Sequence, residues 1–442
     1  MNLYFTGHQE KYAVEQTMLT LFPQERPVYP DPAVTPPGGD NALELQFTRR
    51  PSWCTARAVL RREGKVYTRM CRVRTAALPA DDPVVATRLT RRTLQRAFYL
   101  AAIDCLGKEP PWGMLSGVRP VKLPTRAMEE GGTPRQAEAM LKHYHVSPVR
   151  RQLAMDCAQA SLAVKRSLQP EEISLYVGIP FCPTRCAYCS FISASGSANR
   201  LIPAYLDALF GEIDAAGEAA RRAGKTVRTV YIGGGTPTTL APDQLKALLD
   251  RLHTAFDLAP GTEFTVEAGR PDTITREKLE AIRDGGGNRI SVNPQTMSDL
   301  VLETIGRSHR AEDIRQAYAL AREVGVGAIN MDLIAGLPAD TLEGFAATLD
   351  EVIGMDPENI TVHTLALKKG ARLRQENVPL PSGADVAHML DFAWSALRAA
   401  GYQPYYLYRQ KFMSGSFENV GWCKPGWANA YNICMMEELS DV

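Results

Sequence analysis

From residue 171 onward, short apolar runs alternate with longer segments in which apolar residues recur every three or four positions. The apolar runs predict six strands, at 173–179, 227–232, 263–267, 289–292, 328–334 and 359–367. The longer segments predict helices, at 203–223, 242–256, 275–284, 311–324, 341–354 and 384–400. Strand–helix units in series predict a parallel sheet covered by helices. A doubly wound sheet and a barrel both fit, and periodicity does not choose between them.

The first part of the chain has a different pattern. An apolar run at 3–6 predicts a strand, and a helical pattern follows up to Leu21. Alternating runs predict further strands, at 43–47, 56–60 and 66–70, and the residues between the last two predict a hairpin turn. Helical patterns dominate 84–167. We therefore expect three parts: a smaller α+β domain (1–165), the α/β domain (171–401) and an aromatic C-terminal segment (402–442).

Composition and charge argue against several classes of protein and of partner. The net charge is only +1 and charges of both signs are interspersed, so we expect no nucleic-acid partner. No run approaches the roughly 18 apolar residues of a membrane span, and the N-terminus lacks the features of a signal peptide. We expect a cytoplasmic protein. The nine cysteines form an odd set, which argues against a disulfide framework.

Three cysteines are clustered directly after the first strand of the α/β series. Cys182, Cys186 and Cys189 have the spacing C-x3-C-x2-C. Three thiolates on one tight loop suit an iron–sulfur cube, because each sulfur can reach a different iron. The fourth iron then has no protein ligand, so a small molecule can chelate it. Structural zinc is the alternative, but it would need a fourth Cys or His, and no His lies between 145 and 253.

Other chemically suggestive residues lie at the ends of the later strands, where parallel α/β proteins carry their sites. Gly233–Gly235 could let a ligand approach the backbone closely, or could simply make a tight turn. Glu267 suits ribose hydroxyls, unless it is a surface acid or an ion-pair partner of Arg270. Gln295 could donate and accept hydrogen bonds. Asp332, inside an apolar strand, must be paired or functional.

Specific strings carry a resemblance to a known family. The cysteine triad with Tyr188 and the run Gly233–Pro237 resemble the cluster and amino-group motifs of radical S-adenosylmethionine (SAM) enzymes. Finer strings stand at 176–182, 305–309, 331–338 and 408–411. They resemble the oxygen-independent coproporphyrinogen III oxidase (coproporphyrinogen dehydrogenase) family, and its HemZ-like members most closely. The resemblance covers about 171–436 and is weaker over 1–165, where it rests on layout and on the string 116–122.

The family resemblance implies a fold, two cofactors and a set of site residues. The fold is a partial (β/α)6 TIM-like barrel beside the smaller N-terminal α+β domain, and the cofactors are a [4Fe–4S] cluster and SAM. The implied cluster ligands are Cys182, Cys186 and Cys189. The implied SAM-pocket residues are Tyr176, Tyr188, Gly234, Gly235, Thr236, Glu267, Gln295, Arg307, Asp332 and Ala366. Arg307 has the alternative of a surface arginine at a helix end.

The implied reaction is oxidative decarboxylation of coproporphyrinogen III propionates to the vinyl groups of protoporphyrinogen IX, in porphyrin and haem biosynthesis. A 5′-deoxyadenosyl radical from SAM would remove a hydrogen atom from the propionate β-carbon. The implied partners are the tetrapyrrole and an electron donor such as flavodoxin or ferredoxin. Two alternatives stay open: a haem-binding chaperone without decarboxylase activity, and a radical SAM enzyme acting on another substrate.

Three features depart from the family pattern. Phe191 stands where the best-characterised branch has a fourth cysteine, and Gly178 stands where that branch has His. The family also continues into a Gly- and Ala-rich segment that helps to close the SAM site, whereas this chain stops at Val442. Two interpretations of these departures stay open, a truncated member of the family or a divergent one.

Overall fold

The computed structural model describes residues 1–33, 37–79, 81–191, 193–368, 370–376, 378–410 and 417–442. The chain forms two compact units, of which the first comprises 1–117 with 138–151 and the second 118–137 with 152–442. Residues 118–137 and 152–165, which the sequence assigns to the N-terminal domain, thus group with the second unit. Lys411, the last residue of the 408–411 string, lies outside the described residues.

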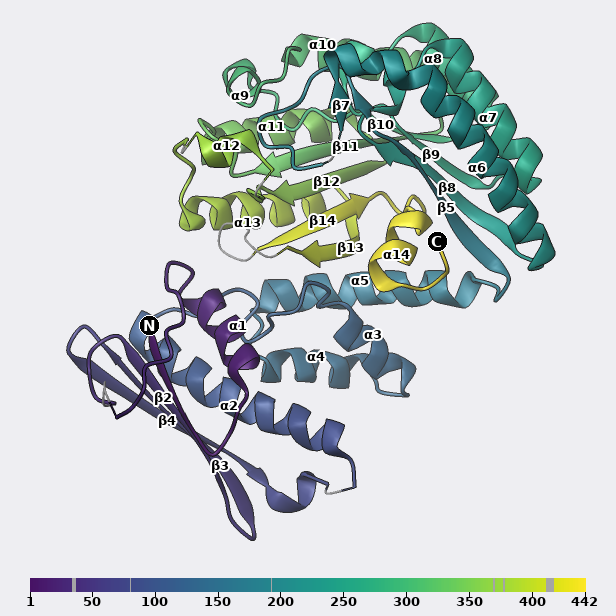
Figure 1. Ribbon diagram of the computed structural model, residues 1–442. Helices are drawn as coiled ribbons and strands as arrows, with labels where there is room; N and C mark the ends of the chain where they lie inside the picture. Colours follow the sequence, from purple (N-terminus) through teal and green to yellow (C-terminus); the bar gives the residue numbers. More distant parts are fainter. Residues whose placement is uncertain (34–36, 80, 192, 369, 377, 411–416) are drawn as a thin grey trace. The chain divides into compact units, whose positions relative to one another are not determined.

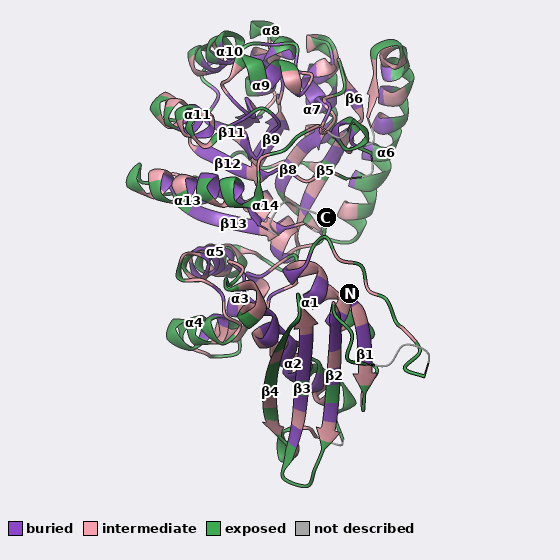
Figure 2. Cartoon of the chain, turned by 90° about the vertical axis from the view of Figure 1, so that its left-hand side faces the viewer, coloured by how far each residue is buried: buried purple, intermediate pink, exposed green. Residues whose placement is uncertain are grey.

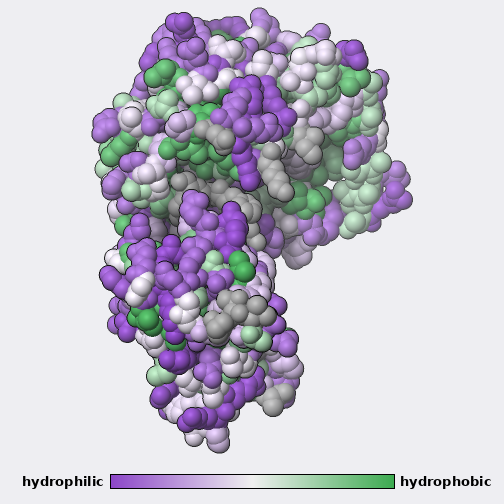
Figure 3. All heavy atoms as spheres, turned by 60° about the vertical axis from the view of Figure 1, so that its left-hand side comes forward, coloured by the Kyte–Doolittle hydropathy of each residue, from purple (hydrophilic) through white to green (hydrophobic). Residues whose placement is uncertain are grey.

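The first unit is an α+β fold with a four-stranded sheet. Its strands are β1 (Asn2–Thr6), β2 (Ala42–Arg49), β3 (Trp53–Arg62) and β4 (Lys65–Arg74), paired in this order, with β1 parallel to β2 and the other pairs antiparallel. The helices α1 (Lys11–Leu21) and α2 (Pro83–Leu106) cover one face and bury side chains such as Met18, Leu60 and Phe98. Figure 3 shows that hydrophilic side chains cover much of the face that it draws, with hydrophobic ones between them.

Three helices connect this region to the barrel strands: α3 (Lys122–Glu129), α4 (Pro134–His143) and α5 (Pro148–Ser167). The C-terminal half of α5 packs, through Ala160 and Val164, against a cluster that contains Tyr405, Tyr406 and Ile433. This contact explains why residues from 152 onward group with the second unit.

The second unit contains the parallel sheet that the sequence predicts. Its parallel strands are β5 (Glu172–Ile179), β8 (Thr226–Gly234), β9 (Glu263–Glu267), β10 (Arg289–Ser291), β11 (Ala328–Ala335) and β12 (Asn359–Thr364), neighbours in sequence order. This order, in a curled sheet, is that of a partial barrel rather than a doubly wound sheet. The expected fold class is therefore confirmed.

Long helices between these strands cover the outer side of the sheet (Figure 1). They are α6 (Ile202–Arg222), α7 (Pro242–Phe256), α8 (Arg276–Asp284), α10 (Ala311–Val324), α11 (Leu342–Met355) and α13 (Gly383–Ala399). In Figure 2, helices such as α6 and α13 carry both buried and exposed residues, as amphipathic helices require. Short elements lie in the connections: β6 (Phe181–Cys182), β7 (Ala194–Ser195), α9 (Asp299–Thr304) and α12 (Arg372–Gln375).

The C-terminal residues extend the same sheet, which the sequence did not predict. Strand β14 (Glu418–Cys423) pairs antiparallel with β12, and β13 (Gln403–Arg409) pairs with β14 at the sheet edge. Helix α14 (Ala430–Glu437) follows, and the carboxylate of Glu263 accepts hydrogen bonds from the backbone N–H groups of Ala430 and Tyr431, both at 2.9 Å. This anion at the helix start fixes α14 to the first residue of β9. No helix among the described residues has the length and apolarity to span a membrane.

Candidate functional site

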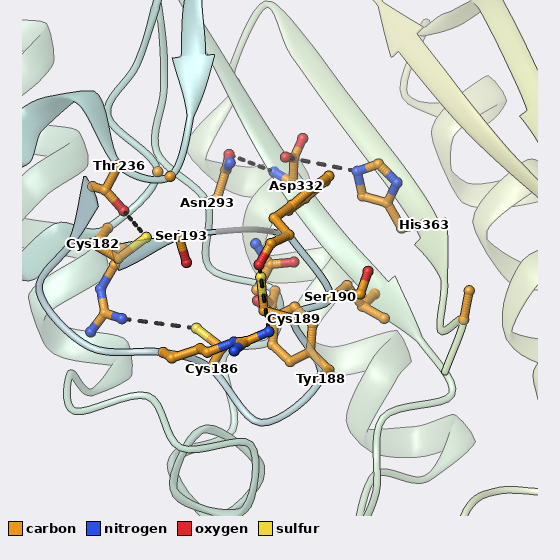
Figure 4. A pocket seen from close by; sticks show the side chains of 18 of the residues that line it. Cys182, Cys186, Tyr188, Cys189, Ser190, Ser193, Thr236, Asn293, Asp332 and His363 are labelled. Carbon is orange, nitrogen blue, oxygen red and sulfur yellow. Dashed lines mark hydrogen bonds and ion pairs between the residues drawn. The ribbon is translucent and has the colours of Figure 1, made fainter. Parts of the chain in front are cut away.

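A pocket in the second unit lies where the parallel strands end. All the predicted site residues except Tyr176 line it, from the cysteine loop after β5 to Ala366 after β12. Side chains that are far apart in sequence therefore meet in one place, as expected for the carboxyl ends of parallel strands. Figure 4 shows the cysteines on one side of the pocket and Asp332 with His363 on another.

The cysteine sulfurs on the loop after β5 receive hydrogen bonds from neighbouring side chains. Thr236 Oγ1 donates to Cys182 Sγ at 3.5 Å (Figure 4), and Arg270 Nη1 donates to Cys186 Sγ at 3.8 Å. The guanidinium of Arg270 is buried, and Asp272 holds it through two contacts of 2.8 and 3.0 Å. Such donors adjust the properties of any iron–sulfur centre that the sulfurs hold.

The donor set fits a cluster better than a single ion. Among the described residues, no three His, Cys, Asp or Glu side chains converge closely enough to hold one metal ion. The thiolates of a cubane bind different irons, so they need not converge on one point. Cys182, Cys186 and Cys189 are all half-buried free thiols that face the pocket, which is the accessibility that cluster insertion requires.

The glycine run after β8 lets the backbone pass close to the cysteine loop. Gly234 has φ +111°, a conformation that residues with a Cβ rarely adopt. A Cβ on Gly235 would stand 2.5 Å from the carbonyl oxygen of Phe181 and 3.0 Å from Cys182 Sγ. Glycine is therefore required here by close approach to the cysteine loop, in addition to making a turn.

Glu267 ends β9 and faces the pocket. It accepts a 2.7 Å hydrogen bond from the hydroxyl of Tyr231, and burial raises its pKa to about 7 despite this bond. The alternative of an ion pair with Arg270 does not hold, because the guanidinium of Arg270 pairs with Asp272 instead. A carboxyl group with an accessible pocket side can accept hydrogen bonds from ligand hydroxyls.

Arg307 is buried in the pocket wall, so its alternative as a surface arginine does not hold. Its Nη1 donates to the carbonyl oxygen of Asn293 at 2.9 Å, and its Nη2 donates to the hydroxyl of Tyr188 at 3.2 Å. Its Nε has no hydrogen-bond partner among the described residues. Gln295 lies beside this network with φ +69°, a left-handed conformation uncommon for glutamine that is held by backbone hydrogen bonds to β11.

Asp332 is both paired and exposed to the pocket. Its carboxylate accepts a 2.7 Å hydrogen bond from Asn330 Nδ2 and lies 3.7 Å from Nε2 of His363. Burial opposes charge on Asp332, but its interactions with His363 and Asn330 prevail and lower its pKa below the usual value. Asp332 is therefore an anion that presents oxygen atoms to a ligand.

Tyr176 lies elsewhere in the barrel. It is on β5, its side chain is 49% exposed, and its ring stacks with those of Tyr231 and Tyr431 at centroid distances of 6.3 and 6.5 Å. Tyr231 in turn donates to Glu267. Tyr176 therefore does not line the pocket itself, and its direct role beside SAM stays a prediction.

The pocket also contains residues that sequence reasoning did not assign to it. Arg270 entered only as a possible ion-pair partner, and Tyr408 only as part of a family string. His363 and Asn419 were not singled out. His363 could have been found as a polar residue near the end of a predicted apolar strand. Asn419 gave no signal, because β14 was not predicted.

Comparisons with known proteins agree on one superfamily. The radical SAM superfamily model matches residues 176–352. The oxygen-independent coproporphyrinogen-III oxidase-like protein HemZ of Bacillus subtilis (strain 168) is 39% identical over 339 residues, which span 75% of this chain and 68% of HemZ.

Two further relatives differ in their described roles. The haem chaperone HemW of Bacillus subtilis (strain 168) is 34% identical over 237 residues, 52% of this chain and 62% of HemW. The solved structure of coproporphyrinogen III oxidase (HemN) from Escherichia coli, described as a radical SAM enzyme, matches with a TM-score of 0.51 and 30% identity. That match covers 61% of this chain and 59% of HemN.

Proposed function

Because the chain belongs to the radical SAM superfamily and to its oxygen-independent coproporphyrinogen-III oxidase-like proteins, we propose that it oxidatively decarboxylates propionate side chains of coproporphyrinogen III. Membership of the superfamily brings a [4Fe–4S] cluster and SAM as cofactors. When bound, they supply a 5′-deoxyadenosyl radical that removes a hydrogen atom from a substrate carbon. Loss of carbon dioxide and transfer of one electron to an acceptor then leave a vinyl group.

The observation that supports this proposal most is the convergence of two groups of side chains in one pocket. Cys182, Cys186 and Cys189 would hold the cluster, with Arg270 and Thr236 donating to two of the sulfurs. The other predicted site residues that line the pocket would bind SAM.

The polar residues of the proposed SAM pocket would bind different chemical groups of SAM. The carboxyl groups of Glu267 and Asp332 would accept hydrogen bonds from SAM hydroxyl or amino groups, and Arg307 would donate to its carboxylate. The glycine turn at Gly234 and Gly235 would leave room for its amino end. These residues bind and orient the cofactor and exclude water from the reacting centre.

The proposed partners are the tetrapyrrole and an electron donor of the flavodoxin or ferredoxin class, with the reaction taking place in the cytoplasm. The second candidate function is haem binding without decarboxylation. It is favoured by the likeness to HemW, a haem chaperone, at 34% identity.

A single set of assays separates the candidates. Reconstituted anaerobically, the protein should hold about four irons per chain, cleave SAM under reducing conditions, and convert coproporphyrinogen III into a product that has lost carbon dioxide. Cys182→Ser should abolish these activities, whereas Cys71→Ser, which alters a half-buried thiol of the first unit, should keep them. SAM cleavage without decarboxylation would contradict the proposed reaction, and tight one-to-one haem binding would then favour the chaperone.

A further inference from the structure

A row of side chains crosses β13, β14, β12 and β11, which are neighbours at one edge of the barrel sheet. Tyr408 on β13 pairs in register with Asn419 on β14, and His363 on β12 pairs with Ile334 on β11. Val362 pairs with Val420, so the antiparallel register places His363 opposite Asn419. All four members of this row line the pocket that contains the cysteines. The row thus forms a continuous wall beside the SAM-binding residues.

Asn419 has a fixed orientation and an unused donor. The backbone N–H of Thr364 donates to Asn419 Oδ1 at 2.8 Å, which directs the amide nitrogen away from Thr364. The side chain is almost completely buried, yet Nδ2 has no hydrogen-bond partner among the described residues. A buried amide without an acceptor costs free energy, so Nδ2 in a pocket wall points to a ligand that accepts a hydrogen bond.

The residues next to Asn419 in the row, His363 and Tyr408, also carry hydrogen-bond donors. The ring of His363 lies 3.7 Å from the carboxylate of Asp332, which orients it, and the phenol of Tyr408 reaches the same pocket. Two cationic side chains, Lys368 and Arg185, line the pocket as well. The carboxylates that line the same pocket accept hydrogen bonds from other side chains, Asp332 from Asn330 and Glu267 from Tyr231.

We propose that Asn419, His363 and Tyr408 form a subsite that binds a carboxylate of the substrate. This inference rests on the proposed function and deepens it, because coproporphyrinogen III carries propionate carboxylates. A carboxylate accepts hydrogen bonds and donates none when ionised, so it complements a wall of N–H and O–H donors with cations nearby. The subsite anchors the tetrapyrrole by one propionate while a neighbouring side chain faces SAM.

Equilibrium binding tests this subsite independently of turnover. The probes are coproporphyrin III, the oxidised and stable relative of the substrate, and its tetramethyl ester, which lacks free carboxylates. Binding to the reconstituted protein is followed by porphyrin fluorescence. Asn419→Asp replaces the donor by an anion and should weaken coproporphyrin binding about tenfold or more, while ester binding and SAM affinity stay within about twofold of the wild type.

Two further variants keep the test decisive. Asn419→Ala and His363→Gln should each weaken coproporphyrin binding and raise KM more than they lower kcat, and they guard against a folding defect in the aspartate variant. Asn432→Ala is the matched control, because it removes an asparagine amide that bonds Tyr405 at 3.2 Å and does not line this pocket.

The outcomes separate the subsite from the reaction. Equal weakening of acid and ester binding, or unchanged binding in the Asn419 variants, would overturn the subsite. If carboxylate-dependent binding falls as expected but wild-type protein forms no vinyl product, the subsite stands and the proposed reaction fails.

Discussion

The cysteine loop after β5 and the antiparallel pair β13–β14 line opposite parts of one pocket, yet they are built differently. The loop presents half-buried thiols, and its hydrogen bonds come from side chains such as Thr236 and Arg270. The antiparallel pair presents donors from residues whose positions depend on sheet register, among them Asn419 and Tyr408. Under the proposed function and the proposed subsite, cofactors bind on the loop side and the substrate binds on the antiparallel side.

The most severe way to test this division is to remove a cluster ligand. Cys186→Ser should reduce cluster content and SAM cleavage by roughly 100-fold or more, because even outer-shell partners of metal ligands contribute 10–100-fold. Iron and sulfide analysis and 5′-deoxyadenosine formation measure the effect. The Asn419 variants should retain both properties. Loss of iron in an Asn419 variant would argue against separate cofactor and substrate sides.

Arg270 tests whether the loop depends on its donors. Arg270→Leu removes the N–H donated to Cys186 Sγ and should speed iron loss to a chelator by roughly 10-fold. It should also lower the reduction potential of the cluster, because a hydrogen bond to sulfur stabilises the reduced, more negative state. Arg270→Lys should restore part of both effects. Identical potentials in the wild type and the leucine variant would show that Arg270 only supports the fold.

The stability of the protein should depend on pH through Glu267 and Asp332 in opposite ways, because their pKa values shift in opposite directions. The pKa of Glu267 rises from 4.5 to about 7 in the folded protein. Between pH 4.5 and about pH 7, the carboxyl group of Glu267 keeps its proton in the folded state and loses it in the unfolded state. The contribution of Glu267 to the free energy of unfolding is therefore full below pH 4.5 and is lost as pH rises to about 7.

Denaturant unfolding of the apo-protein at several pH values measures this contribution. Relative to Glu267→Gln, the wild type should lose roughly 1–3 kcal/mol across this window. The variant comparison is essential, because burial also raises the pKa of Glu437 to about 7. A wild-type minus variant difference that does not change with pH would contradict a buried, protonated Glu267.

The smallest expected effects come from two glycines. Gly235→Ala should destabilise the protein by roughly 1–3 kcal/mol and weaken SAM binding, because the new Cβ would overlap Phe181 and displace the cysteine loop. Gly211→Ala, inside α6 with open space around it, should stabilise the protein by up to about 1 kcal/mol. Thermal unfolding and SAM titration measure both. Equal SAM affinity in the two variants would count against the close approach.

The parallel strands and their helices could be predicted because each carries its signal within a short segment. The sequence predicts a strand at 263–267, and β9 has these bounds. Strands β13 and β14 could not be predicted, because the aromatic run around Tyr405 lacks clear alternation and β14 pairs with the distant β12. For the same reason Asn419 could not be recognised, whereas the cysteine spacing was evident from eight consecutive residues.

The hydrogen bond from the backbone N–H of Tyr431, at the start of α14, to Glu263 joins residues 168 positions apart. A separation of this size affects how the chain folds. Closing so long a loop costs chain entropy before any contact compensates, and contacts of high sequence separation form slowly. The side chains that donate to the cysteine sulfurs lie 54 and 84 positions from them, whereas the pocket wall that contains Asn419 forms only after β14 and α14 have docked. A refolding intermediate should therefore accept iron before it discriminates between coproporphyrin and its ester.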